Sequence, residues 1–229
     1  MILSPANGPP IIYLDTNAIL DIISGIVGLS VSYVSYKYNR LIQERILDYI
    51  SLGFILLGIG LVIQGFIMLL LGFNFARISE DIRLTYISSV MYLILQLAAY
   101  LIITVGYSRE AYWSKSALGF LLTYFVIKKR EYLLLGAYIF DASQLIIILL
   151  LGFIVFLGFL VHVRDRSSFS LLVLLSFFLM LVSHITFLFS SLIFSDFYYL
   201  IANIIQFLGF LLLLVFLVRS GHIGRTKEK

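Results

Sequence analysis

The stretch LDYISLGFILLGIGLVIQGFIMLLLG (47–72) decides the fold, because its 26 residues include one charged side chain, Asp48, next to its start. A helix that crosses the hydrocarbon core of a bilayer needs roughly 20 consecutive, mostly apolar residues. A water-soluble helix of this length would instead show a polar face at the helical period. The sequence therefore predicts a transmembrane helix over 47–72.

The same apolar character recurs along the chain, and short polar segments separate the stretches. The further candidate spans are 11–34, 84–106, 139–162, 170–190 and 198–219. The stretch 107–138 is ambiguous, because its apolar part ALGFLLTYFVI (117–127) is about half a span and the basic run KKRE (128–131) follows it. We predict one all-α domain over 1–229, a polytopic transmembrane helical bundle in the cell membrane with the lipid bilayer as its surroundings.

The distribution of basic residues favours seven spans over six. A fourth span at about 113–130, with the N-terminus outside, places eleven Lys and Arg residues on the cytoplasmic side and five outside. Without that span the numbers are eight and eight. Because short cytoplasmic loops carry an excess of Lys and Arg, we predict seven spans, an external N-terminus and a cytoplasmic C-terminus. Six spans are the alternative.

Composition excludes several classes of protein. Of the 229 residues, 62% are hydrophobic and 12% are charged, about half the charged share of a soluble domain. A soluble enzyme, a disordered protein and a soluble nucleic-acid-binding domain are excluded as descriptions of the whole chain. The chain has no cysteine, which removes disulfides, thiolate nucleophiles, Cys-ligated zinc and iron–sulfur clusters.

Most predicted spans carry a polar residue at depth. These residues are Asp21, Gln64, Gln96, His184, Asn203 and Gln206. Lipid provides no hydrophobic drive for helices to associate, so polar side chains mark the faces on which helices meet. Two interpretations follow: the residues form interhelical hydrogen bonds that hold a bundle together, or they line a polar path or cavity, a possible pore, through it.

Small residues also recur at helical spacing, where they let neighbouring backbones approach closely. We predict helix-packing roles for the glycines Gly25, Gly28, Gly58, Gly65, Gly72 and Gly152.

Two ionisable residues stand out, because placing such a side chain at the bilayer centre costs roughly 2.5–3.5 kcal/mol even on the lenient scale. Asp21 lies about ten residues, or roughly 15 Å, below the outer end of its predicted span. His184 lies in the predicted span 170–190. We hypothesise that His184 pairs with Asp15 or Asp21. The alternative is a structural Asp21 that is protonated or capped by a neighbouring hydroxyl group.

No catalytic or cofactor signature is present in the sequence. The three histidines are His162, His184 and His222, and none forms an H-x-x-x-H pair that could bind a metal. There is no G-x-S-x-G, H-E-x-x-H, P-loop or G-x-G-x-x-G. The last predicted span has no lysine, which excludes a retinal Schiff base. We predict a protein that is not an enzyme and has no cofactor and no metal.

The Ile-, Leu- and Tyr-rich spans, the absence of Cys, the short loops and the N-terminal tail MILSPANGPP (1–10) resemble the polytopic membrane proteins of the crenarchaeal Ced DNA-import system. The resemblance covers the whole length and rests on span number, size and style. It implies a membrane component of a DNA import and exchange apparatus. The implied partners are small two-span membrane subunits and a separate cytoplasmic ATPase, with DNA as the cargo.

Three functions are open at this point. The first is a transport component that forms part of a conduit in a multi-subunit complex and is powered by a separate ATPase; a homo-oligomer is one form of such a complex. The second is a seven-span sensor or scaffold that signals through 36–45 and the C-terminal tail. The third is a proton-coupled small-molecule carrier, or an intramembrane enzyme, that uses Asp21 and His184.

Overall fold

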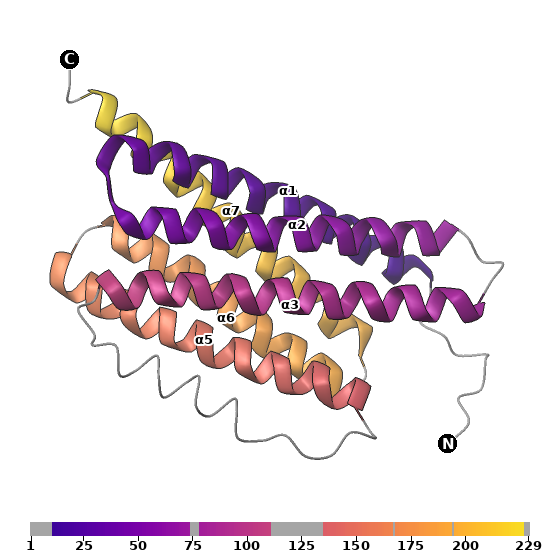
Figure 1. Cartoon of the computed structure of the whole chain (residues 1–229). Helices are drawn as coiled ribbons and strands as arrows, with labels where there is room; N and C mark the ends of the chain where they lie inside the picture. Colours follow the sequence, from indigo (N-terminus) through magenta and orange to yellow (C-terminus); the bar gives the residue numbers. More distant parts are fainter. Residues whose placement is uncertain (1–10, 74–77, 111–134, 167, 194, 227–229) are drawn as a thin grey trace.

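Six long helices make up the part of the chain that the computed structural model describes, residues 11–73, 78–110, 135–166, 168–193 and 195–226 (Figure 1). They are α1 (Ile11–Ile42), α2 (Arg45–Phe73), α3 (Ile78–Glu110), α5 (Leu135–Asp165), α6 (Ser168–Ile193) and α7 (Asp196–Thr226). Each contains a stretch that is long and apolar enough to cross a membrane. The chain is thus an all-α, multi-pass membrane protein, as predicted. The predicted fourth span, 113–130, lies outside the described residues.

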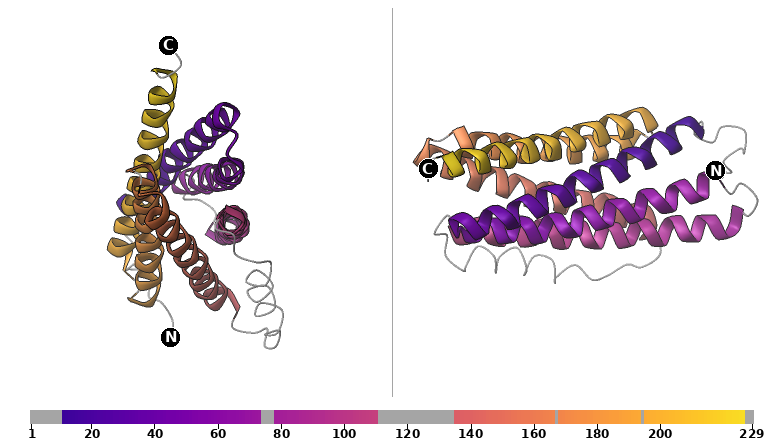
Figure 2. Two further views of the ribbon diagram at one scale, coloured as in Figure 1. Left: turned by 90° about the vertical axis from the view of Figure 1, so that its left-hand side faces the viewer. Right: turned by 90° about the horizontal axis from the view of Figure 1, so that it is seen from above.

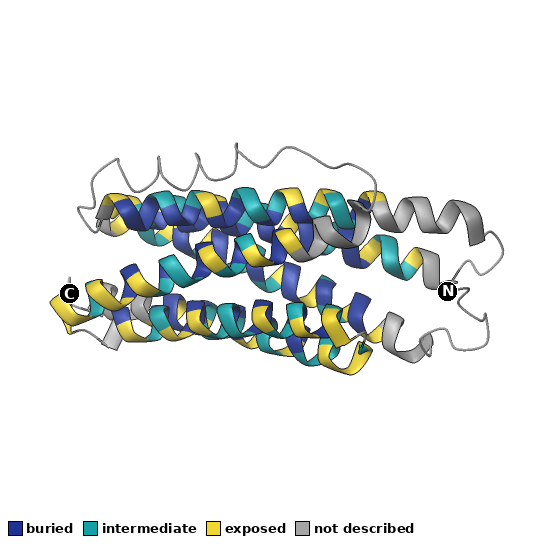
Figure 3. Cartoon of the chain, turned by 90° about the horizontal axis from the view of Figure 1, so that it is seen from below, coloured by how far each residue is buried: buried dark blue, intermediate teal, exposed yellow. Residues whose placement is uncertain are grey.

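The six helices form a closed ring. Each packs against its neighbours in the order α1, α2, α3, α5, α6 and α7, and α7 packs back against α1. Figure 2 shows this ring nearly end-on, and Figure 3 shows the buried residues interspersed with exposed ones along every helix. Side chains of helices that are not neighbours meet across the centre. For example, the Phe54 ring of α2 and the Phe210 ring of α7 lie 5.3 Å apart.

Both α3 and α5 run antiparallel to α6, because their partners fall in sequence number as the number along α6 rises. The pairs are Tyr107–Phe177 and Gln96–His184 for α3, and His162–Ser170 and Gln144–His184 for α5. It follows that α3 and α5 run in the same direction. In Figure 1, α1, α3, α5 and α7 share one direction, whereas α2 and α6 run the opposite way.

The closest helix contact is between α1 and α2, and glycines permit it. A Cβ atom added at Gly25 would lie 2.8 Å from the carbonyl oxygen of Gly58 and 2.9 Å from the backbone nitrogen of Val62. One added at Gly65 would lie 2.6 Å from the carbonyl oxygen of Ala18. Real Cβ atoms do not come this close to backbone atoms, so only glycine fits at Gly25 and Gly65 without a shift of the helices.

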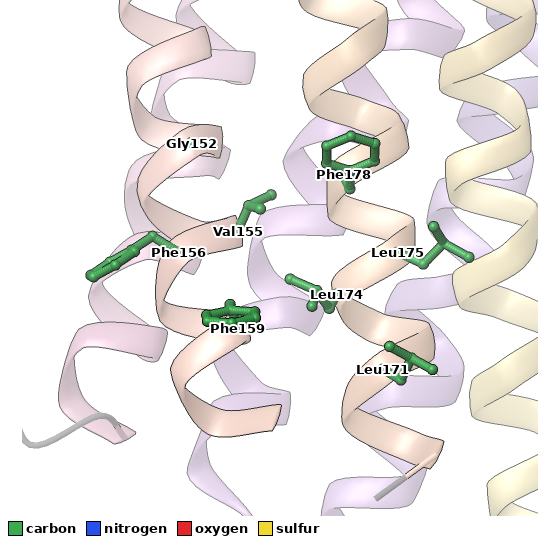
Figure 4. A pocket seen from close by; sticks show the side chains of 8 residues that line it. All are labelled: Gly152, Val155, Phe156, Phe159, Leu171, Leu174, Leu175 and Phe178. Carbon is green, nitrogen blue, oxygen red and sulfur yellow. The ribbon is translucent and has the colours of Figure 1, made fainter. Parts of the chain in front are cut away.

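The other predicted packing glycines differ. Gly28 has ordinary contact space, since an added Cβ would lie 3.5 Å from the Cα of Gly58. Gly72 belongs to α2, but its surroundings lie outside the described part of the chain. The prediction for Gly152 is wrong, because among the described residues an added Cβ meets nothing within 4 Å. Gly152 lines an open apolar groove of about 480 Å³ between α5 and α6 (Figure 4). The helices approach more closely at Gly158, where an added Cβ would lie 3.4 Å from Leu174.

The two ends of the ring differ in charge. The end at which α1, α3, α5 and α7 finish, here called the basic end, carries exposed cationic side chains. They are Lys37, Arg40, Arg45, Arg109, Arg164, Arg166 and Arg219. Arg109 is fixed there by Tyr49 of α2, to whose hydroxyl it donates a hydrogen bond and whose ring lies 5.7 Å from its guanidinium carbon.

Replacing Gly65 by alanine is expected to lower the free energy of unfolding by about 1–3 kcal/mol, the usual cost of overpacking. The new methyl group would press on the backbone of α1. The measurement is thermal unfolding of the purified protein in detergent. Gly152→Ala is the matched control, and we expect no loss of stability there, because its methyl group enters open space. Equal melting temperatures for the two variants would contradict the tight α1–α2 contact.

Candidate functional site

All six candidate polar residues lie inside the ring, and none exposes more than 5% of its surface. Asp21 comes from α1, Gln64 from α2, Gln96 from α3 and His184 from α6, and α7 provides Asn203 and Gln206. These side chains therefore point into the ring and away from the acyl chains, as a polar interior requires. Their direct contacts divide them into a hydrogen-bonded group and a group with unpartnered atoms.

His184 is the centre of the hydrogen-bonded group. Its Nδ1 lies 2.9 Å from Oε1 of Gln144 on α5. Because a carboxamide oxygen only accepts, Nδ1 carries the proton and Nε2 presents a lone pair. That lone pair faces two donors on α3, Nε2 of Gln96 at 3.2 Å and the Tyr100 hydroxyl at 3.1 Å. A neutral imidazole thus links three helices across the ring.

Gln96 extends this network toward α7. Its Nε2 also donates to the Tyr92 hydroxyl at 3.0 Å, and that hydroxyl lies close to the side chain of Gln206 on α7. We call Gln144, His184, Gln96, Tyr92 and Gln206 the polar chain; it crosses the ring from α5 to α7 through α6 and α3.

A second hydrogen bond fixes α1 against α7. Nδ2 of Asn203 donates to Oδ1 of Asn17 at 3.2 Å, and both residues are buried. Together with Asp21, Gln64 and the polar chain, this pair forms a polar layer to which all six described helices contribute. Asp21, Tyr92 and Asn203 precede Lys37, Arg109 and Arg219 of the basic end by 16 or 17 residues, so the layer is displaced away from the basic end.

Asp21 has the least satisfied side chain in this layer. It is 3% exposed, and its Oδ2 has no hydrogen-bond partner among the described residues. Oε1 of Gln64, Oε1 of Gln96 and Nε2 of Gln206 are buried without partners as well. Each such group in an apolar interior costs free energy, and four together are unusual for a layer that serves packing alone.

The hypothesis that His184 pairs with Asp21 is wrong, because Gln144, Gln96 and Tyr100 already occupy both ring nitrogens. The side chain of Asp15, the other predicted partner, lies outside the described residues. A neutral imidazole needs hydrogen-bond partners rather than a counter-charge, and amides and a hydroxyl supply them.

The candidate list from the sequence omitted Gln144, Tyr100, Tyr92 and Asn17. Gln144 was detectable, since it is an amide within the most apolar of the spans. Asn17 precedes Asp21 by four residues and therefore shares its helix face. The two tyrosines gave no separate signal, because tyrosines are numerous in this chain and most are expected at the membrane interfaces.

Between the polar layer and the basic end, large aromatic and aliphatic side chains fill the interior of the ring, together with small buried hydroxyl residues such as Ser32, Ser51 and Thr104. Phe54 and Phe210 meet edge to face across it, and Tyr107 and Phe177 do so at 5.7 Å. All four side chains are buried. Among the described residues, no three His, Asp or Glu side chains gather into a group that could hold a metal ion. The arrangement can hold a small polar or charged species in the polar layer, with apolar packing on its basic side.

No protein-family model matches the sequence, and no curated protein or solved structure is significantly similar to the chain.

Replacing His184 by alanine is expected to destabilise the protein by about 1–3 kcal/mol, because Gln144, Gln96 and Tyr100 lose a buried partner. Thermal unfolding in detergent measures the change. His162→Ala is the matched control; His162 is half-buried, and its Nδ1 lies 2.8 Å from the Ser170 hydroxyl. If the two variants unfolded at the same temperature, His184 would not be the centre of the network.

Proposed function

We propose that this chain is a seven-span transport component of the cell membrane, in which the axis of the helix ring is part of the path. The observation that carries the proposal is the polar layer, to which every described helix contributes a buried polar side chain. Helices that only needed to pack could do so through glycines and apolar side chains, as α1 and α2 do at Gly25 and Gly58. Polar groups without partners inside a bilayer mark solute or ion pathways.

The directions of the helices support a fourth crossing. Because α3 and α5 run in the same direction, the end of α3 at Glu110 and the start of α5 at Leu135 belong to opposite ends of the ring. The 24 residues 111–134 join them. A chain that crosses the hydrocarbon region must satisfy its backbone hydrogen bonds internally, which a helix does. A span of roughly 20 residues fits this interval, and it would make the seven crossings alternate throughout.

The orientation follows from the basic end. Lys and Arg concentrate on the cytoplasmic side of membrane proteins, and the exposed cationic side chains of the described helices lie where α1, α3, α5 and α7 finish. We therefore place the basic end and the C-terminus in the cytoplasm and the N-terminus outside. The polar layer then lies in the outer half of the membrane.

The cargo that fits the interior of one chain is small. The polar chain is held by direct contacts of 2.9–3.2 Å, and aromatic rings meet across the axis toward the cytoplasm. Opening this interior for a proton or a small cation requires side-chain movement, whereas a DNA strand would require the helices to separate. The chain is thus proposed as a non-enzymatic carrier or channel subunit for small cations.

A second candidate is a subunit of a DNA-import apparatus, which the resemblance to Ced-system membrane proteins implies. The observation that favours it is the basic end, whose positively charged arginines and lysine can bind a negatively charged phosphate backbone. In that case DNA passes between this chain and other subunits. This candidate function includes the implied partners, which are the small membrane subunits and the separate ATPase, and self-association of the chain.

Topology can be tested with single cysteines, because the chain has none of its own. We expect Lys129→Cys and Asp196→Cys to react with a membrane-impermeant thiol reagent from outside the cell, and Lys37→Cys to react only after permeabilisation. The fourth crossing between Lys115 and Lys129 is the physical reason. Labelling of Lys129→Cys from the same side as Lys37→Cys would leave six crossings.

Flux through the axis can be tested with the purified chain in proteoliposomes. An ion-sensitive dye inside the vesicles reports the decay of an imposed Na⁺, K⁺ or proton gradient. We expect faster decay than in empty vesicles, and a further several-fold increase for Phe210→Ala, because that substitution removes one side of the Phe54–Phe210 contact. Phe189→Ala is the control, since the Phe189 side chain is 54% exposed on the outer surface of the helix ring.

Two outcomes would redirect the proposal. Gradient decay equal to that of empty vesicles for the wild type and both variants would contradict the small-cation path. If deletion of the gene also abolished DNA transfer between cells of the source organism, the DNA-import candidate would replace it. Unchanged DNA transfer after deletion would exclude that second candidate.

A further inference from the structure

The Asp21 carboxyl lies at the most crowded contact of the ring. It projects from α1 where α2 approaches most closely, so that a Cβ added at Gly65 would lie 3.1 Å from the Cβ of Asp21. The side chain is 3% exposed. A carboxylate in such a place cannot be solvated by bulk water, and its charge is costly unless an opposite charge neutralises it.

The neighbours of Asp21 on α2, α3 and α7 are uncharged, and the histidine of the polar layer is neutral. Gln64 of α2 precedes Gly65 and lies at the same depth. Tyr92 of α3 and Tyr199 of α7 lie within electrostatic range of the carboxyl group. His184 of α6 is held neutral by its three hydrogen bonds. Among the described residues, therefore, nothing supplies the counter-charge.

Three of the unpartnered atoms in the polar layer are oxygens of the kind that bind hard cations. Oδ2 of Asp21 and Oε1 of Gln64 are both buried without hydrogen-bond partners. A third unpartnered oxygen, Oε1 of Gln96, belongs to the residue that binds the Tyr92 hydroxyl. Alkali-metal ions, like other hard cations, take carboxylate, carbonyl and hydroxyl oxygens as ligands, whereas transition metals favour nitrogen and sulfur.

The charge of the site selects the valence of the ion. One carboxylate with otherwise neutral ligands balances a single positive charge. Calcium sites use several carboxylates, and among the described residues Asp21 belongs to no group of three or more His, Asp and Glu side chains.

We propose that Asp21 and Gln64 form a binding site for a monovalent metal cation, Na⁺ or K⁺, between α1 and α2 in the polar layer. If the proposed transport function holds, Na⁺ or K⁺ is the transported ion. The binding site itself rests on the unpartnered oxygens and not on that function. The ion neutralises Asp21 and satisfies Oε1 of Gln64. Its removal leaves a buried charge that loosens the α1–α2 contact.

The experiment measures thermal unfolding of the full chain in detergent at a fixed, mildly alkaline pH. NaCl or KCl replaces choline chloride stepwise at constant ionic strength. Because a ligand that binds only the folded state stabilises it by mass action, we expect the melting temperature to rise and saturate with Na⁺ or K⁺ but not with choline.

Three variants locate the effect. Asp21→Asn keeps the shape of the side chain and removes its charge, and we expect the cation midpoint to increase at least about tenfold, equivalent to roughly 1.4 kcal/mol. Gln64→Leu removes one neutral ligand and should raise the midpoint less. Asp196→Asn removes an exposed carboxylate at the start of α7 and should leave the midpoint unchanged.

The opposing outcomes are equally clear. A melting temperature that is the same in Na⁺, K⁺ and choline, or a cation response that Asp21→Asn retains, overturns the site. A dependence on pH alone means that Asp21 holds a proton, which also overturns it. Should Asp21→Asn fail to fold, the wild-type salt series and Gln64→Leu still decide. Saturable stabilisation without any flux in proteoliposomes would keep the cation site and reject the transport function.

Discussion

A polar side chain inside a membrane protein has to find its partner within the protein, because the surrounding lipid offers none. This constraint shapes the ring more than apolar packing does, since leucine side chains pack as well against acyl chains as against one another. The outer surface of the ring is accordingly rich in exposed Ile, Leu, Phe and Val. The polar residues gather at the axis, where His184 collects donors and an acceptor from two other helices.

The same constraint explains why the ring has one very close contact and several looser ones. Gly25, Gly58 and Gly65 bring the backbones of α1 and α2 together, so these two helices behave as a unit. Across the ring, long side chains do the joining: Tyr100 and Gln96 reach from α3 to His184 on α6. Contacts made by long side chains can rearrange through rotamer changes, whereas a glycine contact between backbones cannot. The contacts of His184 at the axis can therefore change by side-chain rotation without a shift of the helices.

Much of the fold could be predicted from the sequence, because hydrophobic length alone places the six described spans. The inward orientation of Gln64, Gln96 and Asn203 was predictable for the same reason, since a carboxamide facing lipid is costly. Pairing was not predictable. Asp21 and His184 were the two ionisable groups at depth, and charge suggested that they pair, but the order of helices around the ring puts α3 and α5 beside His184. The role of Gly152 was not predictable either. Its spacing resembles that of a packing glycine, yet no neighbouring backbone of the described residues lies next to it.

The interior of the ring is asymmetric along its axis, and this limits how transport could work. The polar layer faces the end at which α1 begins, whereas Phe54, Phe210, Tyr107 and Phe177 fill the axis toward the basic end. An ion held at Asp21 would meet these aromatic side chains toward the basic end, where the polar groups are small hydroxyls such as those of Ser32, Ser51 and Thr104. Rotation of one phenyl ring adds no ligand to these hydroxyls, so passage requires water or further polar groups to enter between α2 and α7. Because α2 is tied to α1 through glycines, α7 is the helix whose displacement would admit them. The Asn17–Asn203 hydrogen bond, which joins α7 to α1 in the polar layer, would then act as the pivot about which the half of α7 nearer the basic end moves.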